Sequence, residues 1–363
     1  AHHQNKFAVY LVHPNESISF AYERDHKDPR ISHSITVDVD NYGIATQSAQ
    51  VVYPRRDGQP NTYPEQQQLH MVLQETAVIH KAGEDDYYVL GIPVEQKAFE
   101  VTGIVPNQVY FTAEELREKL AAVQEINYSD TVNLQKSQKR VLSWSKSFFW
   151  NANQTEALGF KEITWPVLPH HGETTVFTEA LIEEVYKGDL TLNDLEEKGK
   201  YLLKDGYWWA PSPVQFFYGA AQFHLPYKTM DAWSVTGEIG YDHYYFIPVV
   251  SIDALDNKTV ATINYRTLFP EKVIDVQGNT TAAITDALGM VIATTAYGRE
   301  EVEDENGTIR VVDIGDAKME DYVVRFPETL NPLEAIVSQP GLYLQTAATY
   351  FYYDMEAFYT RQQ

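Results

Sequence analysis

The chain has 363 residues, of which 44% are hydrophobic and 13% aromatic, so a folded protein is expected rather than a disordered one. Lys and Arg number 28 against 51 Asp and Glu, which gives a formal net charge of −23. This charge argues against nucleic-acid binding, which needs positive charge opposite phosphates, and against binding to anionic membranes. The absence of Cys excludes disulfides, thiolate metal sites and cysteine nucleophiles. No apolar run is long enough to predict membrane insertion.

Residues 1–106 are predicted to form antiparallel hairpins. Short β-rich runs alternate with turn-forming tetrads such as "HPNE" and "DNYG". The expected strands are Phe7–Pro14, Ser17–Arg24, Ser32–Asp40 and Ile44–Pro54, followed by a further strand pair within Tyr87–Pro106.

Residues 107–215 are predicted to be a mixed α/β insertion with three helices. The first follows Thr112, which together with Glu115 is expected to form a reciprocal capping box. The second spans Phe177–Gly188, with Thr178 as N-cap, and the third spans Thr191–Gly199. A surface loop is expected at "WPVLPHHGE", between the first two helices.

Residues 216–363 are predicted to return to β-structure as a repeat. Asp231, Asp253 and Asp275 are spaced by 22 residues, and units this short must stack on one another to bury a core. The segments between them contain strand-length runs separated by polar tetrads. These tetrads predict hairpin turns, in which Asp accepts backbone hydrogen bonds and Gly takes a positive φ. The turn residues are Asp40, Gly43, Asp253, Asp275, Gly278, Asp286 and Gly289, and the aromatics expected to pack repeat on repeat are Tyr241, Tyr265 and Tyr297.

Several patterns that could indicate a chemical site are better explained by structure. "DVDNYG" begins like a calcium loop, but Tyr42 and Ala49 occupy positions where that loop needs oxygen ligands. "PHHGE" could bring His170, His171 and Glu173 to a metal, but no distant fourth ligand is indicated. With 51 acidic residues, carboxylate pairs arise by chance, and no nucleophile elbow or phosphate loop is present. We therefore predict no catalytic residue, no metal and no cofactor.

The aromatic run "YWWAPSPVQFFYG" (Tyr207–Gly219) has two interpretations. It could be an exposed platform for sugars, or it could pack the insertion against the sheet. Burial is the favoured interpretation, and exposure of Trp208 and Trp209 would support the first.

Longer stretches resemble a known family. "NYRTLFPEKVIDVQGN" and "TDALGMVIATTAYG" are similar to Rhs/YD repeats. "HSITVDVDNYGIATQSAQVVYPRR", "DGYWWAPS" and "FHLPYKTMDAWSVTGEIGYD" resemble, in the same order, the middle-to-C-terminal part of the B component of bacterial insecticidal toxin complexes. The first of these is the most specific, because a hairpin does not require those particular residues.

The resemblance implies a mainly β fold: a long, curved antiparallel strip of Rhs/YD repeats with a small mixed helical insertion. It implies a structural shell segment, not an enzyme, that encloses a cytotoxic polypeptide together with an Rhs-type C component. Delivery would follow through a pore-forming A component, in a secreted complex. No signal peptide is visible at "AHHQNKFAVY", and both ends are expected to be cuts through a longer chain.

Two other functions stay open at this stage. One is a surface or carbohydrate-binding repeat module, and the other is a glycoside hydrolase that uses a carboxylate pair. In addition, an unpaired sheet edge at "TAATYFYYD" is expected to promote self-association.

Overall fold

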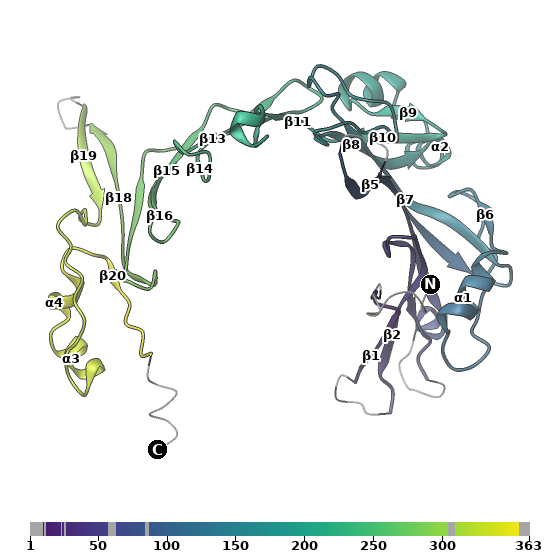
Figure 1. The fold of residues 1–363 in the computed structure, drawn as a ribbon, viewed down its shortest axis with the longest axis horizontal. Helices are drawn as coiled ribbons and strands as arrows, with labels where there is room; N and C mark the ends of the chain where they lie inside the picture. Colours follow the sequence, from purple (N-terminus) through teal and green to yellow (C-terminus); the bar gives the residue numbers. More distant parts are fainter. Residues whose placement is uncertain are drawn as a thin grey trace. The chain divides into compact units, whose positions relative to one another are not determined.

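The computed structural model describes residues 10, 12–22, 24, 27–56, 63–83, 87–303 and 309–355. It divides the chain into two compact units (Figure 1). The first unit comprises residues 1–215 with 231–233, and the second comprises residues 216–230 with 234–363. Each is built on one ten-stranded sheet, which confirms the predicted mainly β, antiparallel fold. The three-part division at residues 106 and 215 stays a prediction.

The sheet of the first unit is an antiparallel meander in the order β1-β2-β3-β4-β5-β7-β8-β10-β9, with β6 joining β7 in parallel. Its strands are β1 (Glu16–Ala21), β2 (Arg30–Val39), β3 (Ala45–Val52), β4 (His70–Lys81), β5 (Val89–Thr102), β6 (Gln124–Ile126), β7 (Gln138–Phe149), β8 (Pro169–Thr178), β9 (Leu202–Lys204) and β10 (Tyr207–Pro211). A short 3₁₀ turn, η1 (Pro64–Gln67), precedes β4.

Strands β1, β2 and β3 lie close to their predicted bounds. Of the predicted strand Phe7–Pro14, residues 7–9 and 11 lie outside the described residues, and residues 10 and 12–14 are not part of a strand. The prediction of a strand pair within residues 87–106 is wrong, because β5 is a single strand of 14 residues. Gly91 takes φ +72°, and the register between β5 and β4 shifts at two places. The strand therefore continues through Gly91 and Pro93 with local irregularities and does not turn there. Strands β4 and β7 were not predicted at all.

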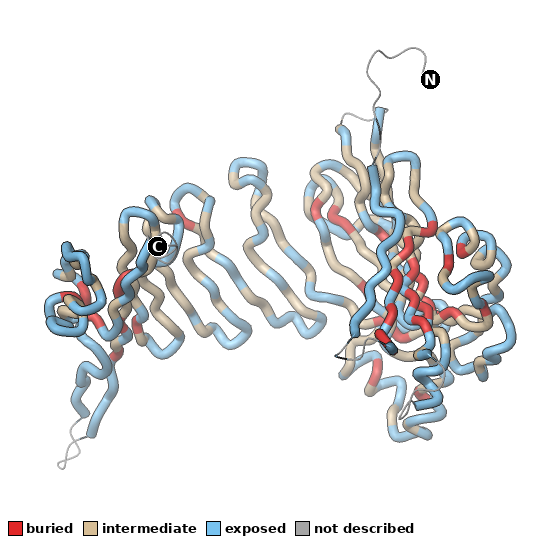
Figure 2. The backbone as a smooth tube through the Cα atoms, turned by 90° about the horizontal axis from the view of Figure 1, so that it is seen from below, coloured by how far each residue is buried: buried red, intermediate tan, exposed pale blue. Residues whose placement is uncertain are grey.

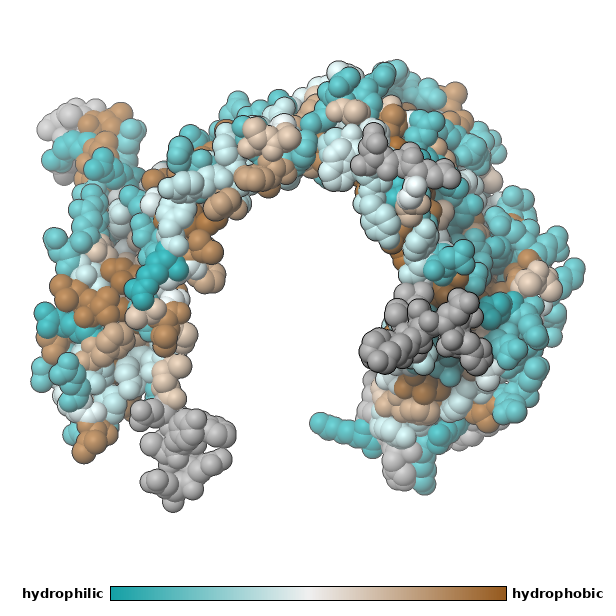
Figure 3. All heavy atoms as spheres, viewed as in Figure 1, coloured by the Kyte–Doolittle hydropathy of each residue, from teal (hydrophilic) through white to brown (hydrophobic). Residues whose placement is uncertain are grey.

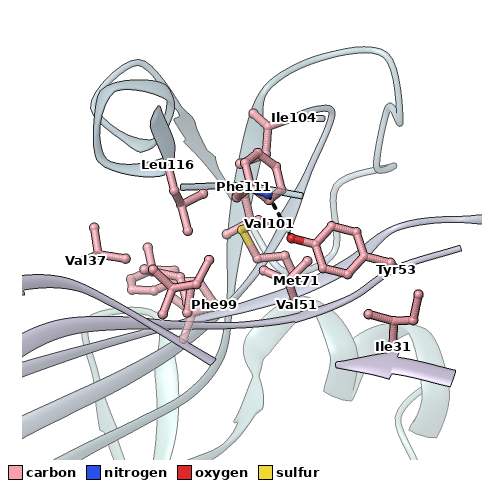
Figure 4. Close-up of a cluster of buried hydrophobic side chains, with 14 residues drawn as sticks. Ile31, Val37, Val51, Tyr53, Met71, Phe99, Val101, Ile104, Phe111 and Leu116 are labelled. Atoms are coloured by element: carbon pink, nitrogen blue, oxygen red, sulfur yellow. Dashed lines mark hydrogen bonds between the residues drawn. The ribbon is translucent and has the colours of Figure 1, made fainter. Parts of the chain in front are cut away.

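The helices cover only parts of the sheet. α1 (Ala113–Leu120) places Leu116, which is fully buried, against Val37 and Phe99 of the sheet (Figure 4). The predicted capping box is only half formed. Thr112 accepts from the Glu115 amide, but the Glu115 carboxylate accepts from the amide of Asn107 at 2.6 Å and pairs with Lys119, so it does not reach back to Thr112.

α2 (Glu179–Tyr186) begins at Thr178, whose hydroxyl accepts from the Leu181 amide as predicted. The third predicted helix is wrong in type: residues Asp194–Lys198 form a single π turn, η2. Thr191 and Asp194 cap it reciprocally, each side chain accepting from the other's amide. That capping box is the signal on which the prediction of a short helix over Thr191–Gly199 rests.

"PHHGE" is not the expected surface loop but the beginning of strand β8. Its neighbour on one side is β7, and on the other side β10 contributes the two consecutive tryptophans. Buried residues are concentrated in the first unit, as Figure 2 shows in red. Among them, Tyr53 fixes the start of the helical segment by accepting a hydrogen bond from the Phe111 amide at 3.0 Å (Figure 4).

The second unit is also an antiparallel meander, with strands β11 to β19 hydrogen-bonded in chain order. They are β11 (Val214–Phe217), β12 (Pro226–Met230), β13 (Thr236–Tyr241), β14 (Pro248–Ile252), β15 (Lys258–Asn264), β16 (Phe269–Ile274), β17 (Thr280–Thr285), β18 (Val291–Glu303) and β19 (Ile309–Gly315), with a 3₁₀ turn, η3 (Ala220–Gln222), after β11. α3 (Pro332–Ser338) and α4 (Pro340–Leu344) follow, and Met319, Tyr322 and Ala347 pack against Ala293 of β18.

At "TAATYFYYD" the chain pairs on one side only within the described residues, so the expected open edge and the self-association through it stay a prediction. Thr349 and Tyr350 form β20, which pairs with Thr294 and Ala293 of β18. After α4 the chain returns beside β18, where β19 has already ended. Within the described residues, no helix is both long and apolar enough to cross a membrane.

Candidate functional site: the repeated aspartate turns

Four hairpin turns share one hydrogen-bond pattern. They begin at Asp40, Asp253, Asp275 and Asp286. In each, the aspartate Oδ1 accepts from the backbone amides two and four residues later, at 2.8–3.0 Å. The aspartate amide donates to the carbonyl four residues on, at 2.9–3.0 Å. The carboxylate thus satisfies amides that the tight turn removes from the ladder.

The fourth residue of each turn has a positive φ. Gly43, Gly278 and Gly289 take φ +80°, +82° and +85°, a conformation in which glycine avoids the Cβ clash of other residues. The turn at Asp253 is different, because Asp256 occupies this position with φ +61°. One of the four turns therefore contains a residue that the backbone conformation disfavours.

Exchanging these residues should change stability in opposite directions. We expect Asp256→Gly to stabilise the second unit by about 1 kcal/mol, because it relieves the left-handed conformation. Gly278→Val should destabilise it by about 1–3 kcal/mol through strain alone, since a Cβ at Gly278 would meet no atom within 4 Å. Scanning calorimetry of both variants checks this. Equal effects of the same sign would contradict the turn geometry.

The turns follow one another at shorter intervals along the chain than the 22-residue spacing indicates. Asp242, Asn264 and Asp286 form a second series with the same spacing, offset by 11 residues from Asp231, Asp253 and Asp275. Because consecutive strands are antiparallel, the two series lie at opposite ends of the sheet. Asp242 accepts from the amides of Phe246 and Ile247, and Asn264 accepts from that of Arg266. The second series was missed because Asn replaces Asp at 264 and the loop after Asp242 is longer.

Asp242 also joins two successive hairpins. Its Oδ2 accepts from the hydroxyl of Tyr265 at 2.8 Å, and the ring of Tyr265 lies edge-on to that of Tyr244, with centroids 5.7 Å apart. Burial raises the pKa of Asp242, but the hydrogen bonds from Ile247, Tyr265 and Phe246 together hold it below its usual value.

The other two aromatic residues predicted to pack repeat on repeat have different contacts. Tyr241 donates its hydroxyl to the carbonyl of Pro226 at 2.8 Å, and its ring lies 6.3 Å from that of Tyr218. Tyr297, in β18, lies opposite Thr280 and Gly315, with the Lys318 ammonium 5.9 Å from its ring. Tyr241 therefore reaches the start of β12 and Tyr265 reaches the loop after β13, whereas Tyr297 sits within the strand ladder.

The two tryptophans of β10 belong to the core of the first unit. Trp208 is 1% exposed and packs with Ile182 of α2 and Leu195 of η2. Trp209, fully buried, points to the opposite face, where it meets Trp144 edge-on at 5.0 Å and donates to the Lys204 carbonyl. Burial of both rings argues against the sugar platform considered for Tyr207–Gly219.

The polar residues of "PHHGE" form a partly buried cluster. The ladder between β7 and β8 skips His170, and this irregularity brings Nδ1 of His170 within 2.7 Å of Nδ1 of His171. Glu173 is 2% exposed; one carboxylate oxygen accepts from Lys204 at 2.6 Å. Within the described residues, no set of three or more His, Asp or Glu side chains is arranged to hold a metal ion.

This cluster predicts a pH dependence. Burial, and secondarily the neighbouring His171, lower the pKa of His170 to about 4. The folded state therefore keeps His170 neutral while the unfolded chain takes up a proton near pH 6.5. Stability of the first unit should fall as the pH drops from about 6.5 toward 4. Urea unfolding followed by tryptophan fluorescence at several pH values measures this.

The control for the pH effect is a substitution at an exposed histidine. His170→Gln should flatten the dependence between pH 6.5 and 4, whereas His70→Gln, at an exposed position of the same unit, should leave it unchanged. Parallel curves for all three proteins would show that His170 does not titrate differently on folding.

Comparison with known proteins confirms the predicted resemblance. Residues 1–92 match a family model described as "Insecticide toxin TcdB middle/C-terminal region". Among curated protein sequences, none matches the chain.

Solved structures with the same fold come from Tc toxins. The TcdB2–TccC3–Cdc42 crystal structure is 24% identical with a TM-score of 0.60 over 87% of this chain, and the TcdB2–TccC3–TEV crystal structure is 23% identical with a TM-score of 0.61 over 89%. The Photorhabdus luminescens Tc holotoxin pore is 22% identical, with a TM-score of 0.60 over 84%. At these identities the likeness establishes the fold. The chain spans 15% of the length of the first two and 14% of the third.

Proposed function

We propose that this chain is a structural segment of the shell of a Tc-toxin B component, here termed the parent chain. The observation that carries the proposal is the combined match: the first 92 residues fit the TcdB middle/C-terminal model, and most of the chain shares the fold of TcdB2–TccC3 structures. In this role the segment does not catalyse a reaction. It forms part of a wall that, with an Rhs-type C component, encloses a cytotoxic polypeptide for delivery through a pore-forming A component outside the producing cell.

The side-chain chemistry fits a wall better than an active site. The aspartates at the turns accept backbone hydrogen bonds that hold the hairpins. The pKa values of Asp40, Asp253 and Asp275 are held below the usual range, at Asp253 chiefly by Asn257 and at the other two by hydrogen bonds that outweigh burial. A general acid for glycoside hydrolysis needs the opposite shift. These carboxylates are therefore suited to turn formation.

Co-expression tests the proposal. The full-length parent chain would be produced with its C-type partner carrying the C-terminal cytotoxic fragment. We expect that fragment to resist protease until the complex is denatured, because the wall excludes the protease. The same fragment added after assembly should be digested. Digestion of both at equal rates would contradict the shell function, and turnover in a screen of common glycosides would favour the hydrolase.

A further inference from the structure

One end of the sheet in the second unit carries a row of exposed apolar side chains. The loops β11–β12, β13–β14, β15–β16 and β17–β18 all lie at this end, because the strands alternate in direction. We name the row the aromatic rim; it consists of Phe223, Tyr244, Phe246, Tyr265, Leu268 and Leu288, which are 64%, 56%, 71%, 50%, 62% and 73% exposed. Figure 3 shows hydrophobic residues at the surface around β16.

The rings of the rim are continuous across three successive loops. Phe223 lies 6.5 Å from Phe246, Phe246 lies 6.1 Å from Tyr244, and Tyr244 lies 5.7 Å from Tyr265. Single exposed apolar residues are normal on a protein surface, but a contiguous set marks an interaction site. The rings touch one another along the row while their outer faces stay open to solvent.

The loops that carry the rings are held by specific bonds. Asp242 anchors the loop of Tyr244 and Phe246 through two backbone amides, and the hydroxyl of Tyr265 ties the next loop to the same carboxylate. Arg266 donates to the carbonyl of Ala287, which connects that loop to the one carrying Leu288. The rim is therefore a fixed surface, and binding to it requires little ordering.

The opposite end of the sheet differs. Leu255 and Val276 are 82% and 53% exposed at the tips of their turns, and they belong to separate hairpins. Exposed apolar side chains at turn tips are thus common to both ends, but continuous ring contacts characterise the rim.

We propose that the aromatic rim is a docking surface for another stretch of the parent chain. The inference rests on the proposed function, since it requires a longer chain. The six side chains carry no formal charge in a chain of net charge −23, so they suit an apolar segment and not a basic ligand. This chain covers only 15% of the solved chains whose fold it shares, and the remaining length would be tethered at high local concentration.

Hydroxyl-radical footprinting of the native full-length parent chain tests the proposal. Oxidation of Phe246 and Tyr244 is compared with that of Leu255, each normalised to the denatured parent chain. We expect the two rim residues to be several-fold more protected than Leu255. Equal reactivity would overturn the proposal. So would protection that disappears on dilution, which would indicate a second copy, or on removal of the enclosed polypeptide, which would indicate that guest.

Substitutions separate docking from folding. In the parent chain, Phe246→Ser should raise oxidation of Leu288, two loops further along the rim, while Leu255→Ser should not change it. Thermal unfolding of each variant shows whether the second unit itself is intact. Protease resistance of the enclosed fragment is scored on the same preparations. A resistant fragment with an unprotected rim would overturn this inference and leave the shell function standing, whereas a digested fragment with a protected rim would do the reverse.

Discussion

Replacing Trp208 with alanine should lower the free energy of unfolding of the first unit by about 3–5 kcal/mol, the usual cost of truncating a buried aromatic side chain. Trp208 is 1% exposed and fills the space between strand β10, α2 and η2. Because α2 and η2 are short, they depend on this contact more than on intrinsic helix propensity. Removing the ring therefore leaves a cavity and weakens the attachment of both elements.

Urea unfolding followed by tryptophan fluorescence measures the loss. All six tryptophans lie in the first unit, so the signal reports on that unit alone. Trp233→Ala is the matched control, since Trp233 is 57% exposed and should cost far less. A sugar-binding platform would give the opposite result: Trp208→Ala would then leave stability intact and abolish glycan binding. Equal destabilisation by the two variants would mean that burial of Trp208 does not determine its contribution.

The sequence predicted those parts of the fold that local chemistry decides. The turns at Asp40, Asp275 and Asp286 follow from aspartate and glycine at fixed spacing, and the N-cap at Thr178 follows from its hydroxyl. These devices act over four or five residues, so a short window of sequence contains the whole interaction. The mainly β, antiparallel fold was predictable for the same reason.

The wrong predictions concern features that depend on contacts between residues distant in the sequence. The strand β5 passes Gly91 and Pro93 because its neighbour β4 adjusts its register, which no local pattern indicates. "PHHGE" becomes a strand because β7 and β10 lie on both sides of it. The aromatic rim was likewise not predicted. Tyr244, Phe246 and Leu268 come together only once alternate loops are known to share one end of the sheet.

Asp242→Ala is expected to lower the melting temperature of the second unit by about 5–10 °C, because three hydrogen bonds to one carboxylate are lost together. Asp242→Asn should be milder, since the amide oxygen can still accept from the amides of Phe246 and Ile247. The pKa of Asp242 is held low in the folded state, so its contribution is present at neutral pH and is lost as the pH falls below about 3.8. Scanning calorimetry at pH 7 and pH 3 measures both effects.

Asp242 differs from the aspartates that only form turns, because it is expected to couple neighbouring repeats. Tyr265→Phe removes only the hydroxyl that donates to Asp242 across the gap between hairpins. If the pair links successive repeats, Tyr265→Phe should destabilise the normal protein but have little further effect in Asp242→Ala. Additive effects would show that each hairpin is stabilised independently. In that case the stability of the strip would come from the backbone ladder and from side-chain packing. The Asp242–Tyr265 hydrogen bond would then add no coupling between repeats, since coupling requires that the loss of one partner removes the effect of the other.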